Sequence, residues 1–428
     1  MQRNCIPRKN RLKTLVIGLD GLSYSLACSL AEAGVLRSLR PFLDSNKAKA
    51  ITSEIPYLSP VNWTSFYTAT GPEKHGVFGF TEFCFKQKEI FFSDFSKVQK
   101  EPLFGPNRAQ NTYFKIINLP HTYPAGPISG QLISGFLSLD LKKAIYPPPL
   151  YSILHAKGYV LEANTIKAFA NPKAIFSELR KTLLARRLAF DLLWPDLIWD
   201  VFIFVLTEPD RLFHFCFDAL MEPKHPLHQK TVNLIQDLDK LVTRVLECFR
   251  KLPEPKRLIF LADHGFTKLH IEVDLNAYFR QIGILQQKYL FTDPDLRGLT
   301  PKTQAFALDA GKIYLYPFCP EAKKLAKQKL GEKIKQWLLA LRYKQKQVIA
   351  RVFWHYELYP EAKFSHVPDL ICVPNPGFDL KGKFDRKNVF EKYTRTGAHL
   401  EKDVLFFDSF GSQVKRVRDV GKLIEEVL

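Results

Sequence analysis

The sequence predicts an α/β fold built around a largely parallel sheet with helices on its faces. Three short apolar runs, at residues 14–19, 201–206 and 257–262, have the composition of strands that are buried on both faces. Residues 230–252, between the second and third runs, carry apolar side chains at the spacing of one helix face. A strand, a helix and a strand in this order indicate a right-handed parallel crossover.

The elements follow in order from the N-terminus. The run at 14–19 ends at Asp20-Gly21, and residues 23–33 form a plausible first helix. We expect one domain over residues 14–428, preceded by a basic tail at 1–13. The irregular, proline-rich stretch at about 82–195 and the stretch at about 267–390 are interpreted as insertions around one core. The second insertion includes a basic helix at 321–343.

Composition favours a globular protein with anionic partners. The chain has 428 residues, 46% hydrophobic and 25% charged, which excludes a wholly disordered chain. Its formal net charge of +19 favours phosphorylated small molecules, nucleic acid or an acidic membrane surface, without choosing among them. The 7 cysteines are scattered without a C-x-x-C motif, which is typical of free thiols in a reducing compartment.

Targeting signals are weak in this sequence. The longest stretch free of Asp, Glu, Lys and Arg, at 116–139, is broken by Pro and Gly, so we expect no membrane span. The basic N-terminus before the first apolar run looks superficially like a secretion signal, but Asp20 interrupts that run. We therefore expect a cytoplasmic protein, and the sequence does not indicate its oligomeric state.

Acidic and metal-binding residues follow each of the three predicted strands. Parallel strands bring their carboxyl ends to one edge of a sheet, where ligands of open α/β proteins bind. An Asp-x-x-x-His pair on a helix and an Asp-His pair after a strand each suit a transition metal, although either alone is more often a solvated helix face or a turn. Their joint occurrence predicts a metal site made of Asp20, Asp210, His214, Asp263 and His264.

A candidate nucleophile lies between the first and second of these strands. Ser59 stands where a loop runs into a probable helix, and a helix N-terminus offers unpaired N–H groups to a phosphate. A divalent metal beside Ser59 would lower the pKa of its hydroxyl group. From local sequence alone, Ser59-Pro60 is more simply a helix cap and turn.

Several motifs together resemble the alkaline phosphatase superfamily, in particular its type I phosphodiesterase/nucleotide pyrophosphatase family. The string VIGLDG at 16–21 looks like the opening strand and first metal ligand of that family. Residues 59–68, followed by GPEKHGVF at 71–78, look like its nucleophile helix and His-Gly turn. TGAH at 396–399 looks like the segment with the last metal-binding histidine.

Two further strings, at 117–124 and 134–136, are similar to a strand and a loop in a microbial subgroup of predicted phosphohydrolases. The resemblance extends from about residue 14 to about residue 410 and is weak in both insertions. It implies an alkaline-phosphatase-like three-layer sandwich, with a mostly parallel central sheet between helices.

The resemblance also implies a two-metal mechanism. One metal would be held by Asp210, His214 and His399, and the other by Asp20, Asp263, His264 and the Ser59 oxygen. Zinc is the usual metal of the family, and manganese occurs in some branches. Ser59 would attack phosphorus and form a covalent phosphoseryl-type intermediate. Asn62 matches a family residue that hydrogen-bonds a phosphoryl oxygen.

The sequence departs from the family pattern in ways that leave alternatives open. Nucleotide pyrophosphatases usually have Thr at the position of Ser59, so the substrate subclass is open. A phosphomonoesterase or a phosphotransferase similar to phosphoglycerate mutase is an alternative in the same superfamily. The string at 59–63 lacks the sulfatase pattern, and the chain lacks the membrane helices of phosphoethanolamine transferases.

A rival from another class is a catalytically silent, basic nucleic-acid-binding homologue. The Lys-rich stretch at 321–350 is conceivable as a nucleic-acid patch, but it is more simply a solvated helix face without interleaved aromatics. Basic residues just before His399 could instead line the cleft and attract an anionic substrate; these are Lys381, Lys383, Arg386, Lys387, Lys392 and Arg395. We therefore expect a phosphorylated small-molecule substrate, and phosphodiesters before monoesters.

Overall fold

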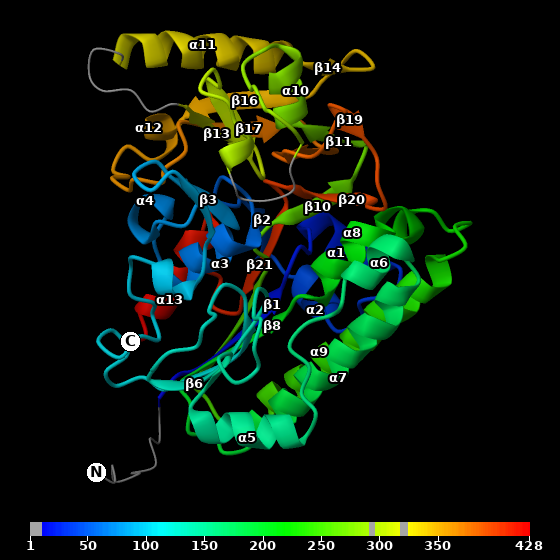
Figure 1. The fold of residues 1–428 in the computed structure, drawn as a ribbon. Coiled ribbons are helices and arrows are strands. Elements are labelled where there is room, and N and C mark those ends of the chain that lie inside the picture. Colours follow the sequence, from blue (N-terminus) through cyan, green and yellow to red (C-terminus); the bar gives the residue numbers. More distant parts are fainter. Residues whose placement is uncertain (1–10, 291–295, 317–323) are drawn as a thin grey trace.

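An eight-stranded sheet forms the centre of the molecule (Figure 1). The computed structural model describes residues 11–290, 296–316 and 324–428. The strand order is β2-β21-β9-β1-β8-β5-β6-β7, and the run from β9 to β6 is parallel. The strands are β1 (Lys13–Leu19), β2 (Ala48–Ile51), β5 (Phe114–Leu119), β6 (Gly130–Ser134), β7 (Ile145–Tyr146), β8 (Val201–Leu206), β9 (Lys256–Leu261) and β21 (Val404–Asp408).

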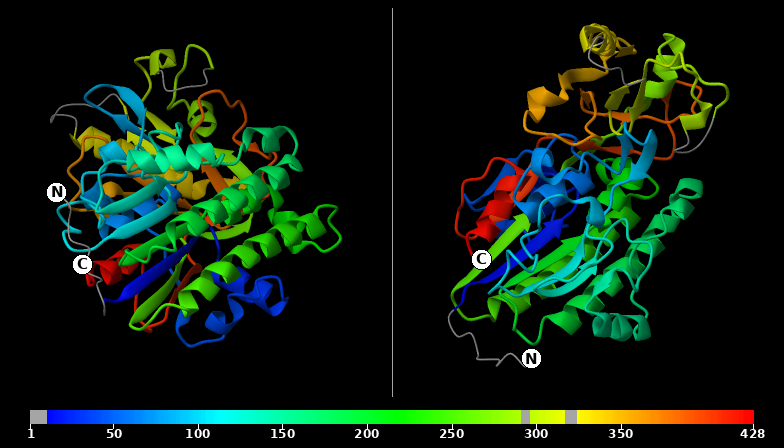
Figure 2. Two further views of the ribbon diagram at one scale, coloured as in Figure 1. Left: turned by 90° about the horizontal axis from the view of Figure 1, so that it is seen from below. Right: turned by 60° about the vertical axis from the view of Figure 1, so that its left-hand side comes forward.

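Helices cover both faces of this sheet, so the three-layer α/β prediction is confirmed (Figure 2, right). Helices α7, α8 and α9 pack against one another on one face, and α3 and α13 pack together on the other. Gly18 in β1 permits the approach of α3, because a Cβ atom there would lie 2.7 Å from the Trp63 ring. The main helices are α1 (Tyr24–Glu32), α2 (Arg40–Leu43), α3 (Ser59–Thr68), α4 (Pro72–His75), α7 (Ala174–Leu193), α8 (Glu208–Met221), α9 (His228–Arg250) and α13 (Val417–Glu425).

A second hydrophobic core lies beyond the carboxyl ends of the parallel strands, in the upper part of Figure 1. We call this part the cap. It holds a four-stranded sheet and a small three-stranded sheet. Its elements include β11 (Ile271–Asp274), α10 (Leu275–Gln281), β12 (Ala305–Leu308), β13 (Lys312–Leu315), α11 (Lys324–Ala340), β14 (Arg342–Tyr343), β15 (Lys346–Gln347), β16 (Ile349–Trp354), α12 (His355–Leu358), β17 (Leu370–Pro374), β18 (Phe378–Lys381) and β19 (Phe390–Glu391).

Two pairs of strands connect the cap to the central layers. The antiparallel pair β10 (Gly265–Lys268) and β20 (Gly397–Leu400) lies at their junction (Figure 1). The hairpin of β3 (Thr81–Cys84) and β4 (Glu89–Phe92) reaches into the cap core, where the Phe83 ring lies 5.0 Å from the Phe306 ring. Parts of both predicted insertions therefore share one core.

The structure corrects the expectation that residues 82–195 are irregular. β5 and β6 from this segment are inner strands of the central sheet, and α7 covers that sheet. The side chains of β5 are fully buried, so its apolar run is a core strand like the three that were predicted. The remaining helices of the segment are α5 (Pro148–Ala156) and α6 (Ile166–Ala170). The predicted domain bounds stay a prediction.

The other predicted elements agree with the structure to within a few residues. β1, β8 and β9 match the predicted strands, and α9 matches the helix between them. The basic helix is α11, with residues 321–323 outside the described residues. The described helices include none that is long and apolar enough to span a membrane. A cytoplasmic location remains a prediction.

Candidate active site

Two clusters of metal-ligating side chains lie at the carboxyl ends of the parallel strands. The first, which we call the closed cluster, consists of Asp20 after β1 and Asp263-His264 after β9. All three side chains are buried. His264 Nε2 lies 3.7 Å from Asp20 Oδ1 and 3.4 Å from Asp263 Oδ2. Neighbouring parallel strands thus bring together residues that are more than 240 positions apart in the sequence.

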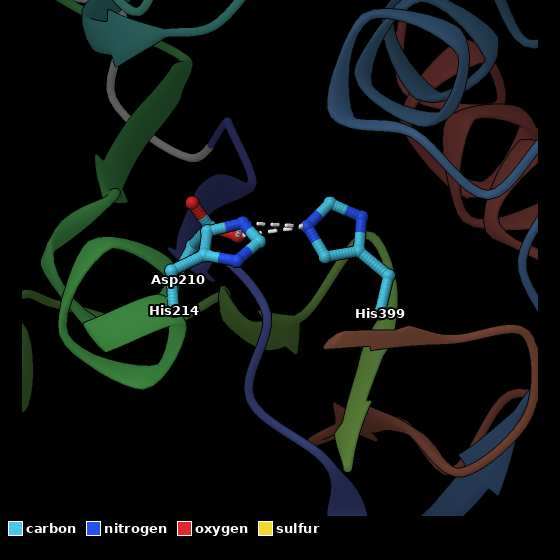
Figure 3. Close-up of side chains that lie close together, drawn as sticks. All are labelled: Asp210, His214 and His399. Atoms are coloured by element: carbon cyan, nitrogen blue, oxygen red, sulfur yellow. Dashed lines mark hydrogen bonds and ion pairs between the residues drawn. The ribbon is translucent and has the colours of Figure 1, made fainter. Parts of the chain in front are cut away.

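The second cluster, the open cluster, consists of Asp210, His214 and His399 (Figure 3). The first two lie one turn apart on α8, and His399 comes from β20 on the opposite side. His399 Nε2 lies 3.0 Å from His214 Nε2 and 3.2 Å from Asp210 Oδ1. The backbone carbonyl oxygen of Tyr57 lies 3.2 Å from His399 Nδ1. This contact orients the imidazole ring so that Nε2 faces the cluster.

Ser59 and His264 join the two clusters. Ser59 Oγ lies 3.3 Å from His264 Nε2, and that nitrogen is 3.8 Å from Asp210 Oδ1. The His264 and His399 rings stack with centroids 3.6 Å apart. Ser59 is the first residue of α3. Pro60 contributes no N–H group to this helix start, and the N–H groups of Val61 and Asn62 donate to Leu58 O, each over 3.0 Å. The structure therefore brings every sequence-predicted ligand and the candidate nucleophile into one site.

Electrostatics in the site show carboxyl groups crowded together without enough compensating charge. Burial, then Asp263 and Asp210, raise the pKa of Asp20 well above its ordinary value. Burial and Asp210 raise the pKa of Asp263 to about 6. Burial also opposes ionisation of Asp210, but His214 and Arg211 outweigh it and hold the pKa of Asp210 well below its ordinary value. A cation between the clusters would relieve the repulsion among these carboxylates.

The donor set fits divalent metal ions. Asp20 Oδ1, Asp210 Oδ1 and Asp263 Oδ2 are buried and accept no hydrogen bond from the described residues, although buried carboxylate oxygens normally have partners. Burial lowers the pKa of His214 and of His264 to about 4, so both rings are neutral at pH 7 and available as ligands. Mixed carboxylate and imidazole donors suit zinc and also manganese.

Hydrogen bonds from Gly21 and Trp63 hold the closed cluster in place. Gly21 has a φ of 73°, a left-handed conformation that glycine adopts without strain, and Gly21 N donates to Asp263 Oδ1 over 3.2 Å. The Trp63 indole N–H donates to Asp20 Oδ2 over 2.9 Å. The role of Trp63 is not visible in the sequence. Its position four residues after Ser59 gives no local sign that its ring would reach across to β1.

A pocket of about 340 Å³ opens onto the open cluster and Ser59. Arg211 lies beside it and bonds Asp210 Oδ2, with its guanidinium 3.8 Å from the centre of the Phe136 ring. This arginine was also missed, because its neighbour Asp210 alone matched a ligand pattern. On the cap side, the pocket wall includes three of the basic residues that were expected there: Lys381, Lys383 and Arg395.

Asn62 has a different environment from the one expected. It is fully buried, its Oδ1 accepts from Glu54 N over 2.7 Å, and its Nδ2 donates to Leu58 O over 3.2 Å. These bonds tie the loop before Ser59 to the first turn of α3. Asn62 is not among the described residues that line the pocket. Its contact with a phosphoryl oxygen therefore stays a prediction.

Comparison with protein families identifies the chain. The family model of type I phosphodiesterase/nucleotide pyrophosphatase matches residues 14–399. The chain belongs to this family. The matched region includes both clusters and Ser59. Membership confirms the expected resemblance and the expectation of a hydrolase acting on phosphoric esters. A search of curated protein sequences gives no significant match.

Solved structures with the same fold come from bacteria and mouse. Phosphonoacetate hydrolase from Sinorhizobium meliloti 1021, in complex with phosphonoformate, has a TM-score of 0.65 at 13% identity, covering 97% of this chain and 96% of its own. Murine ectonucleotide pyrophosphatase/phosphodiesterase 5 has a TM-score of 0.58 at 13% identity, covering 97% of this chain and 95% of its own. An inactive form of the murine protein in complex with AMP has a TM-score of 0.56 at 13% identity, covering 97% of this chain and 94% of its own.

Proposed function

We propose that the chain is a two-metal-dependent phosphohydrolase that cleaves phosphodiester or nucleotide pyrophosphate bonds through a covalent intermediate on Ser59. One observation carries this proposal: the Ser59 hydroxyl contacts His264 at a pocket beside two metal-ligand clusters, whose three buried carboxylates each have an oxygen that accepts no hydrogen bond from the described residues. The structural neighbours include complexes with phosphonoformate and with AMP, which supports an anionic phosphorus compound as substrate.

The two clusters would each hold one divalent ion, most simply zinc, with manganese as the alternative. Asp210, His214 and His399 would bind the first ion, and Asp20, Asp263, His264 and Ser59 Oγ the second. Such ions would lower the pKa of the Ser59 hydroxyl and stabilise the charge that develops on the phosphoryl group.

The chain itself positions the nucleophile and the substrate. Ser59 Oγ would form a bond to phosphorus while the bond to the leaving oxygen breaks, and the hydroxyl proton of Ser59 would pass to solvent or to that leaving oxygen. Water would then cleave the phosphoseryl ester and restore the hydroxyl group. The start of α3 holds Ser59 in place, because the N–H groups of Val61 and Asn62 both donate to Leu58 O over 3.0 Å.

Diesters are the proposed preference over monoesters. A monoester dianion needs an additional cationic clamp beside the phosphoryl group. Arg211 is close to the site, but it bonds Asp210, which offsets its charge. Asn62 is neutral and its amide is engaged by the backbone. The phosphomonoesterase and mutase-like alternatives would require one of the cations on the cap side of the pocket to reach the phosphoryl group.

Trapping of the intermediate tests this proposal. Zinc-loaded and manganese-loaded protein should hydrolyse bis(p-nitrophenyl) phosphate faster than p-nitrophenyl phosphate. Acid quenching during turnover, followed by peptide mass spectrometry, should place the phosphoryl adduct on Ser59. Hydrolysis with no adduct on any residue would indicate direct attack by water. No hydrolysis of either ester by the loaded protein would favour the silent nucleic-acid-binding alternative, which retention of labelled RNA on a filter would then examine.

A further inference from the structure

The wall of the pocket opposite Ser59 carries a group of positive charges from the cap. Lys381 at the end of β18, Lys383 just after it and Arg395 before β20 line the same pocket as Ser59 and His399. None of these three residues belongs to either metal-ligand cluster. Their charges are therefore available to an anionic group of the substrate.

Two carboxylates on this wall neutralise only part of the positive charge. Lys381 Nζ lies 2.7 Å from Asp379 Oδ2, and Lys383 Nζ lies 2.9 Å from Asp309 Oδ2. Both acidic residues are thus paired with a lysine. Arg395 approaches Asp379 only to 3.8 Å, and it makes no hydrogen bond to any part of the chain that the structure describes. The wall keeps one net positive charge, and the guanidinium of Arg395 retains free donors.

Hydrogen bonds tie the residues on both sides of Arg395 to neighbouring segments. Thr396 N donates to His214 O over 2.8 Å, and Thr394 Oγ1 donates to Phe169 O over 3.1 Å. Helix α8 departs from helical geometry at Cys216, and there the N–H of Phe217 donates to Thr396 Oγ1 over 2.8 Å. The break in α8 thus allows residues 394–397 to hydrogen-bond the helix that carries Asp210 and His214.

Because these hydrogen bonds hold the backbone before and after Arg395, less conformational entropy is lost when its side chain binds a ligand. Guanidinium groups bind carboxylate and phosphate oxygens through two parallel N–H donors. Arg395 is 26% exposed, so its donors are reachable from the pocket without a large desolvation cost.

We propose that Arg395, assisted by Lys381, binds an oxyanion on the portion of the substrate that is not the reacting phosphoryl group. This inference rests on the proposed function of the site and narrows its substrate class. The natural substrate would be an ester with a second anionic group, either a phosphate or a carboxylate. Esters with two neutral substituents would bind more weakly.

Three matched diesters test the inference: p-nitrophenyl phenyl phosphate, and its analogues with a carboxylate or a phosphonate at the para position of the phenyl ring. All release p-nitrophenol, so the chemical step is the same. The wild-type protein should show a higher kcat/KM for at least one anionic analogue. In Arg395→Gln, the ratio of anionic to neutral kcat/KM should fall by about 10-fold to 100-fold, as expected for lost charge-assisted hydrogen bonds.

The matched control is Lys392→Gln, which removes one positive charge from the same segment at an exposed position outside the pocket. It should leave the ratio unchanged, whereas Arg395→Lys should recover part of it. An unchanged ratio in Arg395→Gln, or an equal fall in Lys392→Gln, would overturn the inference. The analogue that responds more strongly distinguishes carboxylate from phosphate as the bound group.

Binding without turnover separates this inference from the proposed function. Isothermal titration of the Ser59→Ala protein with the same diesters reports the subsite whether or not the chain hydrolyses them. Tighter binding of an anionic analogue, lost in the Ser59→Ala, Arg395→Gln double variant, would support the subsite even if no hydrolysis is found. Equal binding of all three diesters would overturn it even if hydrolysis is found.

Discussion

The two clusters have the same kinds of donor atom but differ in how the fold holds them. The closed cluster stands at the ends of β1 and β9, which are hydrogen-bonded neighbours in the central sheet. The open cluster combines α8 with β20, a short strand whose partner β10 leads into the cap. Asp20, Asp263 and His264 are buried, whereas His214 and His399 have side chains that are 12% and 13% exposed.

This difference leads us to expect different tasks for the two clusters. Ligands on paired core strands have little freedom, so the closed cluster suits an ion that stays bound and positions Ser59. Ligands that line a pocket leave coordination positions within reach of substrate and water, which is the arrangement of catalytic rather than structural metal sites. We expect the open cluster to lose and regain its ion more readily than the closed cluster.

Metal removal should have the largest effect. Exhaustive chelation is expected to abolish hydrolysis, because the proposed mechanism needs an ion in each cluster. Activity and metal content should be followed together by p-nitrophenol release and elemental analysis during dialysis against a chelator. If the open cluster exchanges its ion more readily than the closed cluster, one ion should leave first, and activity should disappear with it.

Restoration with zinc or manganese provides the control for this experiment, since it excludes irreversible unfolding. Simultaneous loss of both ions would show that the difference in burial does not produce a difference in exchange. Full activity of the fully depleted protein would contradict the two-metal proposal.

Replacement of Ser59 by Ala should lower turnover by about 10³-fold or more, as is typical of the loss of a nucleophile. The fold should persist, with a cost of about 1 kcal/mol or less, because a single oxygen beside the pocket is removed. Ser59→Thr should retain partial activity, since it keeps the hydroxyl group. Turnover, metal content and melting temperature together check this expectation. Near-normal turnover of the Ala variant with both metals bound would return Ser59 to the role of a helix-start residue.

Single ligand substitutions compare the clusters directly. His399→Ala and Asp263→Ala should each reduce activity on the order of 10²-fold. Their effects on stability should differ in the metal-loaded protein. Asp263 is fully buried and accepts the Gly21 N–H, so its loss leaves a buried donor unpaired, whereas His399 stands beside the pocket.

The melting temperature should therefore fall further in Asp263→Ala than in His399→Ala. Elemental analysis should show one remaining ion in each variant. An equal or larger fall of the melting temperature in His399→Ala would mean that the more buried cluster does not contribute more to stability.

The parts of the site that could be predicted are those that follow buried strands. Residues 201–206 and 257–262 are continuous apolar runs, so their ends, and the ligands Asp210 and Asp263 after them, could be located from sequence. His399 has no such local pattern. It was placed through the resemblance to the family, which supplied the chain order of the ligands.

The cap side of the pocket could not be predicted, because it depends on contacts between distant segments. The hairpin at 81–92 packs into the core around Phe306, more than 200 residues later, and no local periodicity reports this contact. The break of α8 at Cys216 likewise depends on Thr396 and has no sign in the helical sequence itself. The proposed specificity therefore depends on the portion of the fold that is least visible in the sequence.

The smallest expected effect concerns Trp63, which orients the closed cluster without being one of its ligands. Trp63→Phe removes the indole N–H that Asp20 Oδ2 accepts, and such outer contacts change metal affinity by about 10-fold to 100-fold. We expect the low end of this range, about 10-fold, since Asp20 is also confined by its place after β1. The smaller ring also leaves space against Gly18, which adds a packing cost.

Trp199→Phe is the matched control, because it separates packing from hydrogen bonding. Both tryptophans are fully buried, but the Trp199 indole N–H has no hydrogen-bond partner among the described residues. Both substitutions should lower the melting temperature through lost packing. Only Trp63→Phe should lower the affinity for the more slowly exchanging ion, as measured by competition with a zinc indicator. If the two variants weaken metal binding equally, Asp20 does not depend on its indole partner, and the rigidity of the closed cluster comes from the sheet alone.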